Sequence, residues 1–359
     1  MSNSTHRVNV VRISEILPHT NADTLGIVQI GGYQVVVKKE NYKVGDLALY
    51  IQPDTIVPVL PAFEFLWEGT EPTERRRRIT VRRFRKEWSE GLLMPLSDFP
   101  DLVMMFENNH NISVGDDVAK LLGFTHYEEP DPTIVLGTPG RKLTLWQRFL
   151  RLFGIQPRQY GPKKGPGVYG MDSIKNYPRM FEEGEPVIAT EKIHGSNARY
   201  YFDGKQFWVG SHKKWWKDKT NIWWRVAEKY GWIEEFCREF PKHTLRGEVT
   251  PTQGGYLYGR HAEEQFFAFD VQRPDGSYWD KVALYKCNLI QKLVPVVYQG
   301  PYDAAKIKAL AEGNSLADGA KHIREGLVIS PEKERTTRGV GRVQLKLKSM
   351  AFFEKEGKA

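Results

Sequence analysis

Short β-type runs separated by turn residues fill the sequence from Val8 to about residue 124. They include RVNVVRISEIL, LGIVQIGGYQVVVKK, GDLALYIQPDTIVPV, RRITVRRF and EGLLMPLSDF, and no long helical period runs through them. Runs of this length, joined by Gly, Pro, Asn and Asp, are typical of a small closed β-barrel. This pattern constrains the fold more than any other feature of the chain, and it predicts an all-β domain.

The chain of 359 residues is longer than one hydrophobic core usually supports, so we expect two domains. The composition changes between them, because residues 141–165 hold seven Lys or Arg and no acidic residue. We therefore predict an OB-type β-barrel domain over residues 1–125, a basic linker over 126–168 and an α+β domain over 169–359.

Local signals refine this division. In the linker, TLWQRFLRLFG has the boundary residues of a short helix, with Thr144 as its N-cap and Gly154 as its stop. In the α+β domain, Asp203-Gly204 and Asp275-Gly276 stand between β-type runs and predict hairpins. Further helices are expected in the segments 221–240, 302–313 and 316–325.

Composition limits the class of protein. The 52 Lys and Arg against 44 Asp and Glu give a net charge of +8, which favours a polyanionic partner, although a merely basic surface is the alternative. Cys237 and Cys287 are too few for a disulfide framework or a zinc pattern. The sequence has neither a signal peptide's apolar core nor a run of about 18 apolar residues. We expect a soluble protein of the cytoplasm or another intracellular compartment, with no membrane partner.

Lys192 stands in the stretch EKIHGSN and is a candidate nucleophile. An amine is nucleophilic only when neutral, so the ordinary pKa of a lysine, about 10.4, has to fall. Neighbouring cations or a bound metal lower it most directly. In VQLKLKS, Lys346 and Lys348 are two residues apart, so on a strand both point to one face and also suit a phosphate.

EKIHGSN (191–197) resembles motif I of the covalent nucleotidyltransferases, in the Lys-x-His-Gly-Ser/Thr-Asn form of the RNA ligase 2-like group. The resemblance continues in family order with RGEV (246–249), FFAFDV (266–271), EGLVIS (325–330) and QLKLKS (344–349), which are similar to motifs III, IIIa, IV and V. It implies an adenylation domain with antiparallel sheets and flanking helices. The β-type module in front is similar to that of RNA ligases with an N-terminal OB domain.

The resemblance also implies roles for individual residues. Lys192 would attack the α-phosphorus of ATP and carry AMP through a phosphoramidate bond. Glu325 would hold a hydrated Mg²⁺ or Mn²⁺, with Glu248 as a second candidate ligand of the metal. The residues implied in binding the nucleotide are Glu191, His194, Asn197, His212, Glu248, Phe269, Glu325, Lys346 and Lys348.

Three of these assignments carry alternatives. On a regular strand Phe267 shares a face with Phe269, so either ring could stack on adenine. The family usually has an arginine where this chain reads GSHKK, so His212 or Lys213 would replace it. The basic residue that orients pyrophosphate is Lys175 or Arg179.

A basic run in the first domain, RRRRITVRRFRKEW, is the candidate nucleic-acid interface. Its eight basic residues exceed what an ordinary strand carries unless one side meets phosphates; a solvated loop or a localisation signal is the alternative. The residues are Arg75, Arg76, Arg77, Arg78, Arg82, Arg83, Arg85 and Lys86.

These observations lead to one functional prediction. The chain is expected to be an ATP-dependent RNA ligase that joins 3′-hydroxyl and 5′-phosphate ends through lysyl-AMP and RNA-adenylate intermediates. We expect it to act as a monomer in RNA repair, on nicked duplexes or broken ends. The alternatives are a DNA or mixed-strand ligase, a GTP-using capping-type enzyme and a non-catalytic nucleic-acid-binding protein.

Overall fold

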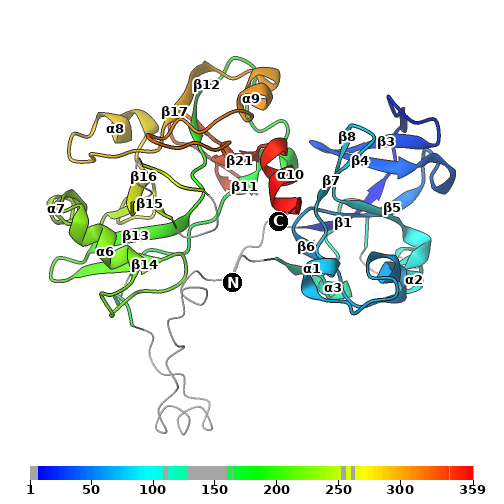
Figure 1. Ribbon diagram of the computed structural model, residues 1–359, viewed down its shortest axis with the longest axis horizontal. Coiled ribbons are helices and arrows are strands. Elements are labelled where there is room, and N and C mark those ends of the chain that lie inside the picture. The colour runs from blue at the N-terminus through cyan, green and yellow to red at the C-terminus, as the bar shows by residue number, and fades with distance from the viewer. Residues whose placement is uncertain are drawn as a thin grey trace, which may run out of the picture. The chain divides into compact units, whose positions relative to one another are not determined.

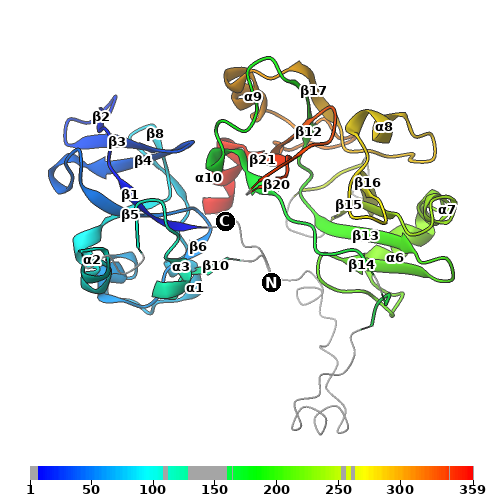
Figure 2. The same cartoon turned by 180° about the vertical axis from the view of Figure 1, so that it is seen from behind.

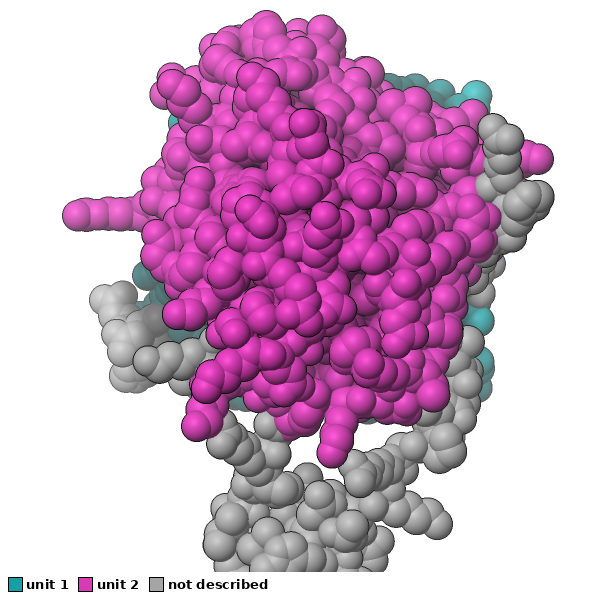
Figure 3. All heavy atoms as spheres, turned by 90° about the vertical axis from the view of Figure 1, so that its left-hand side faces the viewer, with its two compact units in different colours: residues 1–129, 172–180, 350–359 teal, residues 130–171, 181–349 magenta. Residues whose placement is uncertain are grey.

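The computed structural model describes residues 7–107, 112–127, 160–163, 165–251, 256–259, 263–338 and 340–358. The chain folds into two compact units, coloured separately in Figure 3. The first comprises residues 1–129, 172–180 and 350–359, and the second residues 130–171 and 181–349. The chain therefore enters the first unit three times, whereas the sequence prediction divided it by simple order. The predicted linker helix lies outside the described residues.

The first unit is built from short strands (Figure 1). Its sheets have the strand orders β1-β5-β9 and β2-β3-β4, with the smaller pairs β7-β8 and β10-β6. Its strands are β1 (Val8–Arg12), β2 (Leu17–Pro18), β3 (Leu25–Ile30), β4 (Tyr33–Lys38), β5 (Leu47–Ile51), β6 (Thr55–Ile56), β7 (Val81–Phe84), β8 (Glu87–Glu90), β9 (Leu92–Pro95), β10 (Thr125–His126) and β11 (Asp172–Ser173). Its α-helices are α1 (Glu74–Arg77), α2 (Pro100–Glu107), α3 (Ala119–Leu122) and α10 (Met350–Lys358), and its 3-10 turns are η1 (Lys39–Asn41), η2 (Pro61–Leu66), η3 (Leu96–Asp98) and η4 (Ile174–Asn176).

Strand β5 explains how this unit is held together. Its sequence LALYI is almost continuously apolar because both faces of the strand are buried. Leu49 and Ile51 point into one hydrophobic cluster with Phe63, while Ala48 and Tyr50 point into a second cluster on the side of β3 and β4. The β-rich prediction for this part of the chain is confirmed.

The second unit contains two antiparallel sheets with helices. One sheet has the order β14-β13-β15-β16, and the other contains β21-β18-β12-β17 (Figures 1 and 2). The strands are β12 (Pro186–Glu191), β13 (Ser196–Phe202), β14 (Phe207–Ser211), β15 (Thr244–Thr250), β16 (Gln265–Gln272), β17 (Val296–Pro301), β18 (Gly326–Pro331), β19 (Thr336–Thr337), β20 (Gly341–Arg342) and β21 (Leu345–Lys348). The helices are α6 (Ile222–Lys229), α7 (Trp232–Glu239), α8 (Lys281–Lys286) and α9 (Ala304–Leu310).

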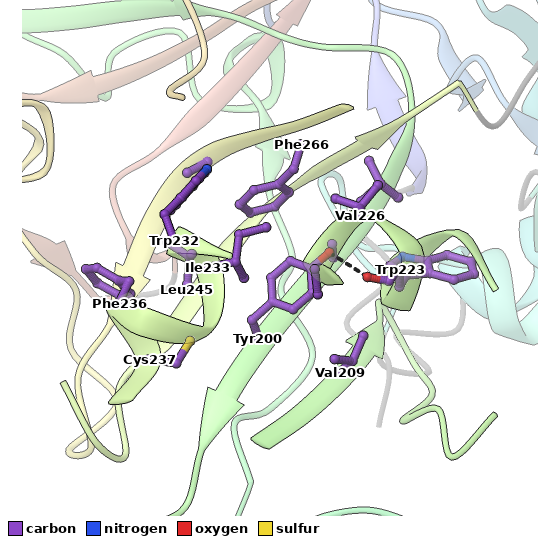
Figure 4. Packing of buried hydrophobic residues seen from close by; sticks show 14 of the residues in the cluster. Tyr200, Val209, Trp223, Val226, Trp232, Ile233, Phe236, Cys237, Leu245 and Phe266 are labelled. Atoms are coloured by element: carbon purple, nitrogen blue, oxygen red, sulfur yellow. Dashed lines mark hydrogen bonds between the residues drawn. The ribbon is translucent and has the colours of Figure 1, made fainter. Parts of the chain in front are cut away.

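Helices α6 and α7 cover one face of the sheet β14-β13-β15-β16. Figure 4 shows their contact, in which Trp223, Ile233 and Phe236 pack on Tyr200 and Leu245 of the strands. The buried hydroxyl of Tyr200 donates a hydrogen bond to the Trp223 carbonyl oxygen at 3.1 Å. With this face closed by apolar packing, the polar residues that alternate with it project from the opposite face.

Most of the secondary structure predicted for this unit is confirmed. Asp203-Gly204 joins β13 to β14, and the segment 302–313 contains α9. The helical structure expected over 221–240 consists of two helices, α6 and α7, with Tyr230 and Gly231 between them.

The helix predicted over 316–325 is wrong. The segment is a loop in which the Ser315 amide donates to the His322 carbonyl oxygen at 2.9 Å. Arg324 donates to the carbonyl oxygens of Asn314 and Leu310, which ties the end of the loop back to α9. Tertiary contacts therefore override the helical pattern of the segment.

Candidate active site

Lys192 lies at the point where β12 ends, beside the first residue of β18. Its backbone amide donates to the Gly326 carbonyl oxygen at 2.9 Å, which continues the pairing of Glu191 with Leu327. The side chain then reaches Glu325, with 2.7 Å between Nζ and Oε1. The predicted nucleophile and the predicted metal-binding carboxylate are thus brought together from positions 133 residues apart.

Glu325 is the electrostatic centre of this group. Its side chain is buried, and besides Lys192 it faces His194 Nδ1 at 3.3 Å and Lys348 Nζ at 3.9 Å. Burial raises the pKa of a carboxyl group, but here Lys192, the His194 hydrogen bond and Lys348 outweigh burial and hold the Glu325 pKa well below its usual range. The site therefore contains a carboxylate that stays ionised at physiological pH.

The loop between β12 and β13 is pressed against β15 at Gly195. A Cβ atom on Gly195 would lie 2.4 Å from the Val249 carbonyl oxygen and 2.9 Å from Cγ of Glu248. No side chain fits there without moving backbone, so a glycine is required. In the same loop the His194 amide donates to the hydroxyl of Tyr258 at 2.9 Å. Tyr258 is fully buried and was not identified from the sequence.

Asn197 and Glu248 oppose each other on β13 and β15, on the sheet face that the helices leave uncovered. Asn197 Oδ1 is buried, and so is Thr250 Oγ1 two residues beyond Glu248. Neither atom has a hydrogen-bond partner in the part of the chain that the structure describes. Buried polar atoms are normally bonded, so this face fits a polar ligand that supplies hydrogen bonds.

The two candidate aromatic rings on β16 occupy different environments. Phe267 opposes Glu248 and is buried against Tyr258, with their ring centroids 5.6 Å apart. Phe269 is the extra residue of a β-bulge, is half-buried and has its ring centroid 5.2 Å from that of Tyr169. Ala268 between the two rings packs in the core under the helices, so both rings lie on the opposite face, and the bulge changes the alternation only from Asp270 onward.

Lys346 and Lys348 lie on one face of β21, as the sequence predicted. The alternating residues Leu345 and Leu347 are buried, whereas both lysines are half-buried. Lys348 opposes Gly326 on β18, which explains how its ammonium reaches Glu325. Lys348 and an ionised carboxylate are therefore gathered at Lys192, and Lys346 lies on the same face of β21 as Lys348.

Glu191 and His212 have surroundings that the sequence did not indicate. The Glu191 carboxylate is buried and accepts hydrogen bonds from the Ser315 hydroxyl and, at 2.7 Å, from the Leu316 amide. These bonds attach the loop that follows α9 to the end of β12. His212 is half-buried directly after β14, next to the pairing of Ser211 with Ala198.

The described residues between 160 and 169, here called the strap, cross the open face of the sheet β14-β13-β15-β16. They contact the four strands in order. The Tyr160 ring packs on Trp208 of β14, and the Pro166 carbonyl oxygen accepts a hydrogen bond from Arg199 of β13. The Gly167 carbonyl oxygen accepts from Arg246 of β15, and the Tyr169 hydroxyl donates to Asp270 of β16. The strap ends beside Phe269, the candidate ring for stacking on adenine.

A buried ionic network lies at this end of the strap. Asp270 accepts from Arg342 through both carboxylate oxygens, at 2.7 and 2.9 Å, and from Lys281 at 2.7 Å. Lys281 also donates to the Phe269 carbonyl oxygen at 2.8 Å. The network fixes the backbone of the residue that is the candidate for base stacking.

Several predicted basic residues are occupied by other contacts within the first unit. Lys175, a candidate for orienting pyrophosphate, pairs with the buried carboxylate of Glu90. Arg78 pairs with Asp54 at 2.6 Å, and Arg77 donates to the Pro72 and Val57 carbonyl oxygens. Arg77 and Arg78 thus stabilise the fold around α1, whereas Arg75, Arg76, Arg82, Arg83, Arg85 and Lys86 are exposed.

The side chains around Glu325 limit the kind of metal site that is possible. The described residues contain no group of three or more His, Cys, Asp or Glu that could enclose an ion. A single ionised carboxylate at Glu325, surrounded by groups suited to phosphate oxygens, fits a hydrated divalent ion rather than a closed protein site. Among the same residues, no helix is long and apolar enough to cross a membrane.

Comparison with known proteins decides the class of this site. Residues 185–348 match the RNA ligase family model, and residues 7–96 match an OB-fold domain. The chain carries an RNA ligase domain. The match spans every candidate residue from Glu191 to Lys348, and the predicted combination with an N-terminal OB-fold domain is confirmed.

Solved structures support the fold over nearly the whole chain. A variant of Naegleria gruberi RNA ligase with ATP and Mn is 22% identical, with a TM-score of 0.74 over 97% of this chain and 98% of that one. The Naegleria gruberi RNA ligase with PPi is 23% identical, with a TM-score of 0.73 over 99% and 100%. No curated protein sequence matches the chain. At this identity the ligase domain and the OB-fold domain share their architecture with these enzymes.

Proposed function

We propose that this chain is an ATP-dependent RNA ligase that joins 3′-hydroxyl and 5′-phosphate RNA ends. The observation that carries the proposal is the contact of Lys192 with Glu325, with Lys348 beside them, inside a matched RNA ligase domain. The Naegleria structures with ATP and Mn, with AMP and Mn, and with PPi support the choice of nucleotide and metal. RNA repair, by a monomer in a reducing intracellular compartment, is the setting we propose.

Lys192 acts in the first of three displacements at phosphorus. Its neutral amine attacks the α-phosphorus of ATP, the N–P bond forms, the bond to pyrophosphate breaks and the amine proton leaves. In the second step the 5′-phosphate of RNA displaces Lys192, and in the third the 3′-hydroxyl attacks and AMP leaves. Lys346 and Lys348 would neutralise negative charge on the phosphate. Such cations contribute most to the rate when the fold positions them before the reaction.

Glu325 and the open sheet face have separate tasks in this scheme. Glu325 holds Lys192 before reaction and would ligate the hydrated divalent ion, which would supply positive charge beside the phosphate. Asn197, Glu248 and Thr250 offer polar groups to the nucleoside, and Phe269 offers a ring face to the base. Glu191, His194 and His212 shape the pocket around these groups.

The test is covalent labelling of the protein. With ATP labelled at the α-phosphate and Mg²⁺ or Mn²⁺, the protein should acquire one labelled AMP that survives denaturation, and Lys192→Ala should acquire none. Lys308→Ala is the matched control, because that lysine is exposed on α9 and has no part in the proposed reaction. Absence of label, or label that persists in Lys192→Ala, would refute the proposal. Labelled GTP, and nicked RNA, DNA and hybrid duplexes, separate the alternative enzymes.

The β7-β8 hairpin is the proposed RNA contact of the OB-fold domain. Its turn holds Arg85 and Lys86 at φ 44° and 79°, a region that side chains other than glycine rarely adopt. Hydrogen bonds brace this turn from the β2-β3 loop: His19 lies 3.1 Å from the Phe84 carbonyl oxygen, and Asn21 donates to that of Arg85. A braced, strained turn with exposed basic side chains fits a functional role.

Replacing Arg82, Arg83 and Lys86 by glutamine should weaken RNA binding while AMP labelling stays unchanged. Each removed side chain that had neutralised a phosphate should reduce the slope of log Kobs against log salt by about 0.7 to 0.9. The check is fluorescence anisotropy of labelled RNA between 50 and 200 mM salt. The control replaces Lys38, Lys39 and Lys43, which are exposed in the same unit. An equal effect of both triple variants would argue against a hairpin site.

A further inference from the structure

Residues 213–219, KKWWKDK, form a basic stretch that the proposed reaction does not use beyond its first residue. We call it the lysine segment; it follows β14 in the ligase domain. Lys213, Lys214, Lys217 and Lys219 are all exposed there. Lys213, at the start of the segment, stands where the family resemblance leads us to expect an arginine. The three further lysines have no role in the proposed reaction and require another explanation.

The lysine segment is held in place by its backbone and by its two tryptophans. The Ser211 amide donates to the Lys214 carbonyl oxygen at 2.8 Å, and the Trp216 amide donates to that of Val209 at 2.9 Å. The Trp216 carbonyl in turn accepts from Trp224 Nε1 of α6 at 3.0 Å. The turn is therefore fixed to β14 on one side and to α6 on the other, so the backbone that carries the lysines is held in one conformation.

A row of aromatic rings lies beside the segment. The ring centroids of Tyr160 and Trp208 are 5.1 Å apart, and those of Trp208 and Trp215 are 6.4 Å apart. Tyr160, at the outer end, is 37% exposed, which leaves ring surface for a further stacking partner. Trp208 is fixed by a hydrogen bond from Nε1 to Asp203 Oδ2 at 2.8 Å.

Two acidic residues near this surface are engaged in turns, and a third, the exposed Glu228 of α6, lies 4.0 Å from Lys219. Asp203 accepts from the backbone amides of Lys205 and Gln206, both at 2.8 Å. Asp218 accepts from the amide and the hydroxyl of Thr220, both at 3.0 Å. These bonds stabilise turns, and the side that faces solvent carries the lysines. The surface is therefore complementary to a polyanion.

We propose that the lysine segment and the aromatic row bind a single-stranded segment of the RNA substrate. The lysines would contact successive phosphates, and the Tyr160 ring would stack on an unpaired base. Lysines interleaved with aromatic rings are the chemistry of single-strand binding, because every unpaired base offers a ring face. A continuous duplex offers phosphates but no free base face. This inference rests on the proposed function and names the form of its substrate.

The test compares two triple variants of the full-length protein. Lys214→Gln, Lys217→Gln and Lys219→Gln remove three cations from the segment. Lys286→Gln, Lys306→Gln and Lys308→Gln remove three exposed cations from α8 and α9, which lie at the opposite end of this unit from α6 and β14 (Figures 1 and 2). Binding of labelled single-stranded RNA and of a blunt RNA duplex is measured by anisotropy across a salt series.

Loss of the segment's lysines should flatten the salt dependence for single-stranded RNA by about 2 in slope. Tyr160→Ala should weaken single-strand binding about fivefold or more without changing the slope, while Phe65→Ala, an exposed ring of the first unit, should have no effect. The duplex should respond to neither Tyr160→Ala nor Phe65→Ala.

Two results would overturn the inference: equal salt slopes for the two triple variants, or a Tyr160→Ala effect of the same size on the duplex. AMP labelling of the same preparations separates this failure from failure of the proposed function. Protein that takes up AMP and binds RNA, yet shows either result, retains its function and lacks this site. Protein that takes up no AMP contradicts the proposed function itself.

Discussion

Replacing Glu325 by glutamine should slow formation of lysyl-AMP at least a hundredfold. The substitution keeps the size of the side chain but removes the charge that Lys192 and Lys348 face at 2.7 and 3.9 Å. It also removes the proposed ligand of the divalent ion. Loss of one preorganised electrostatic interaction typically costs two to three orders of magnitude in rate. The measurement is single-turnover labelling with ATP at a series of Mg²⁺ and Mn²⁺ concentrations.

Glu332 supplies the matched control. It directly follows β18, whereas Glu325 directly precedes the strand, and its carboxylate accepts from Gln299 at 2.9 Å. Glu332→Gln should label at the rate of the unaltered protein. A Glu325→Gln variant that is folded and labels at more than a tenth of the normal rate would remove Glu325 from the mechanism, since structural damage could only lower the rate further.

The candidate catalytic residues were predictable because they stand in short local sequence motifs. Lys192, Glu325 and the pair Lys346 and Lys348 each sit at a strand end or on a strand, where residue type and spacing indicate direction. Their convergence follows from the pairing of β12, β18 and β21, which brings the three segments together. The OB-fold domain was predictable for a similar reason, since turn residues punctuate its strands.

What the sequence concealed depends on partners far apart in the chain. Tyr258 is an ordinary aromatic residue until its hydroxyl is seen to accept from the His194 amide, 64 positions away. No sequence pattern marks the strap, because its contacts with Arg199 and Arg246 are made by the backbone carbonyl groups of Pro166 and Gly167. Such backbone contacts carry no residue signature, so only the folded arrangement reveals them.

The bulge in β16 illustrates a second limit. In a regular strand, FFAFDV would place Asp270 on the same face as Phe266 and Ala268, towards the helices. The register shifts between Arg246 and Gly247, so Asp270 opposes Arg246 and lies with Phe269 on the open face. Counting alternate residues does not reveal one extra residue in a strand, although that residue decides which face Asp270 occupies and hence its contacts with Arg342 and Tyr169.

Replacing Asp270 by asparagine should lower the free energy of unfolding of the ligase domain by about 3 to 5 kcal/mol. Asp270 is almost fully buried and is the shared partner of Arg342 and Lys281. Without its charge both cations remain buried in a medium that solvates them poorly. Unfolding by urea, followed by tryptophan fluorescence, reports on this domain because seven of the ten tryptophans lie between residues 208 and 279.

The effect should depend on pH in a defined direction. Burial raises the pKa of Asp270, but Arg342 and Lys281 outweigh it and hold that pKa well below the usual range. A carboxyl group whose pKa is lower in the folded state stabilises the fold fully above its unfolded pKa, about 3.9. That contribution is lost as the pH falls from there through the folded pKa. The difference between the two proteins should therefore be constant from pH 7 to pH 5 and shrink below pH 4.

Asp275→Asn is the control for this prediction, because its carboxylate only caps the exposed turn at Ser277. It should unfold near the urea concentration of the unaltered protein. If Asp270→Asn also did so, the ionic network would be energetically neutral, as a buried charge cluster can be when desolvation offsets attraction. Phe269 would then owe its position to packing against Tyr169 rather than to the bond from Lys281 to its carbonyl oxygen.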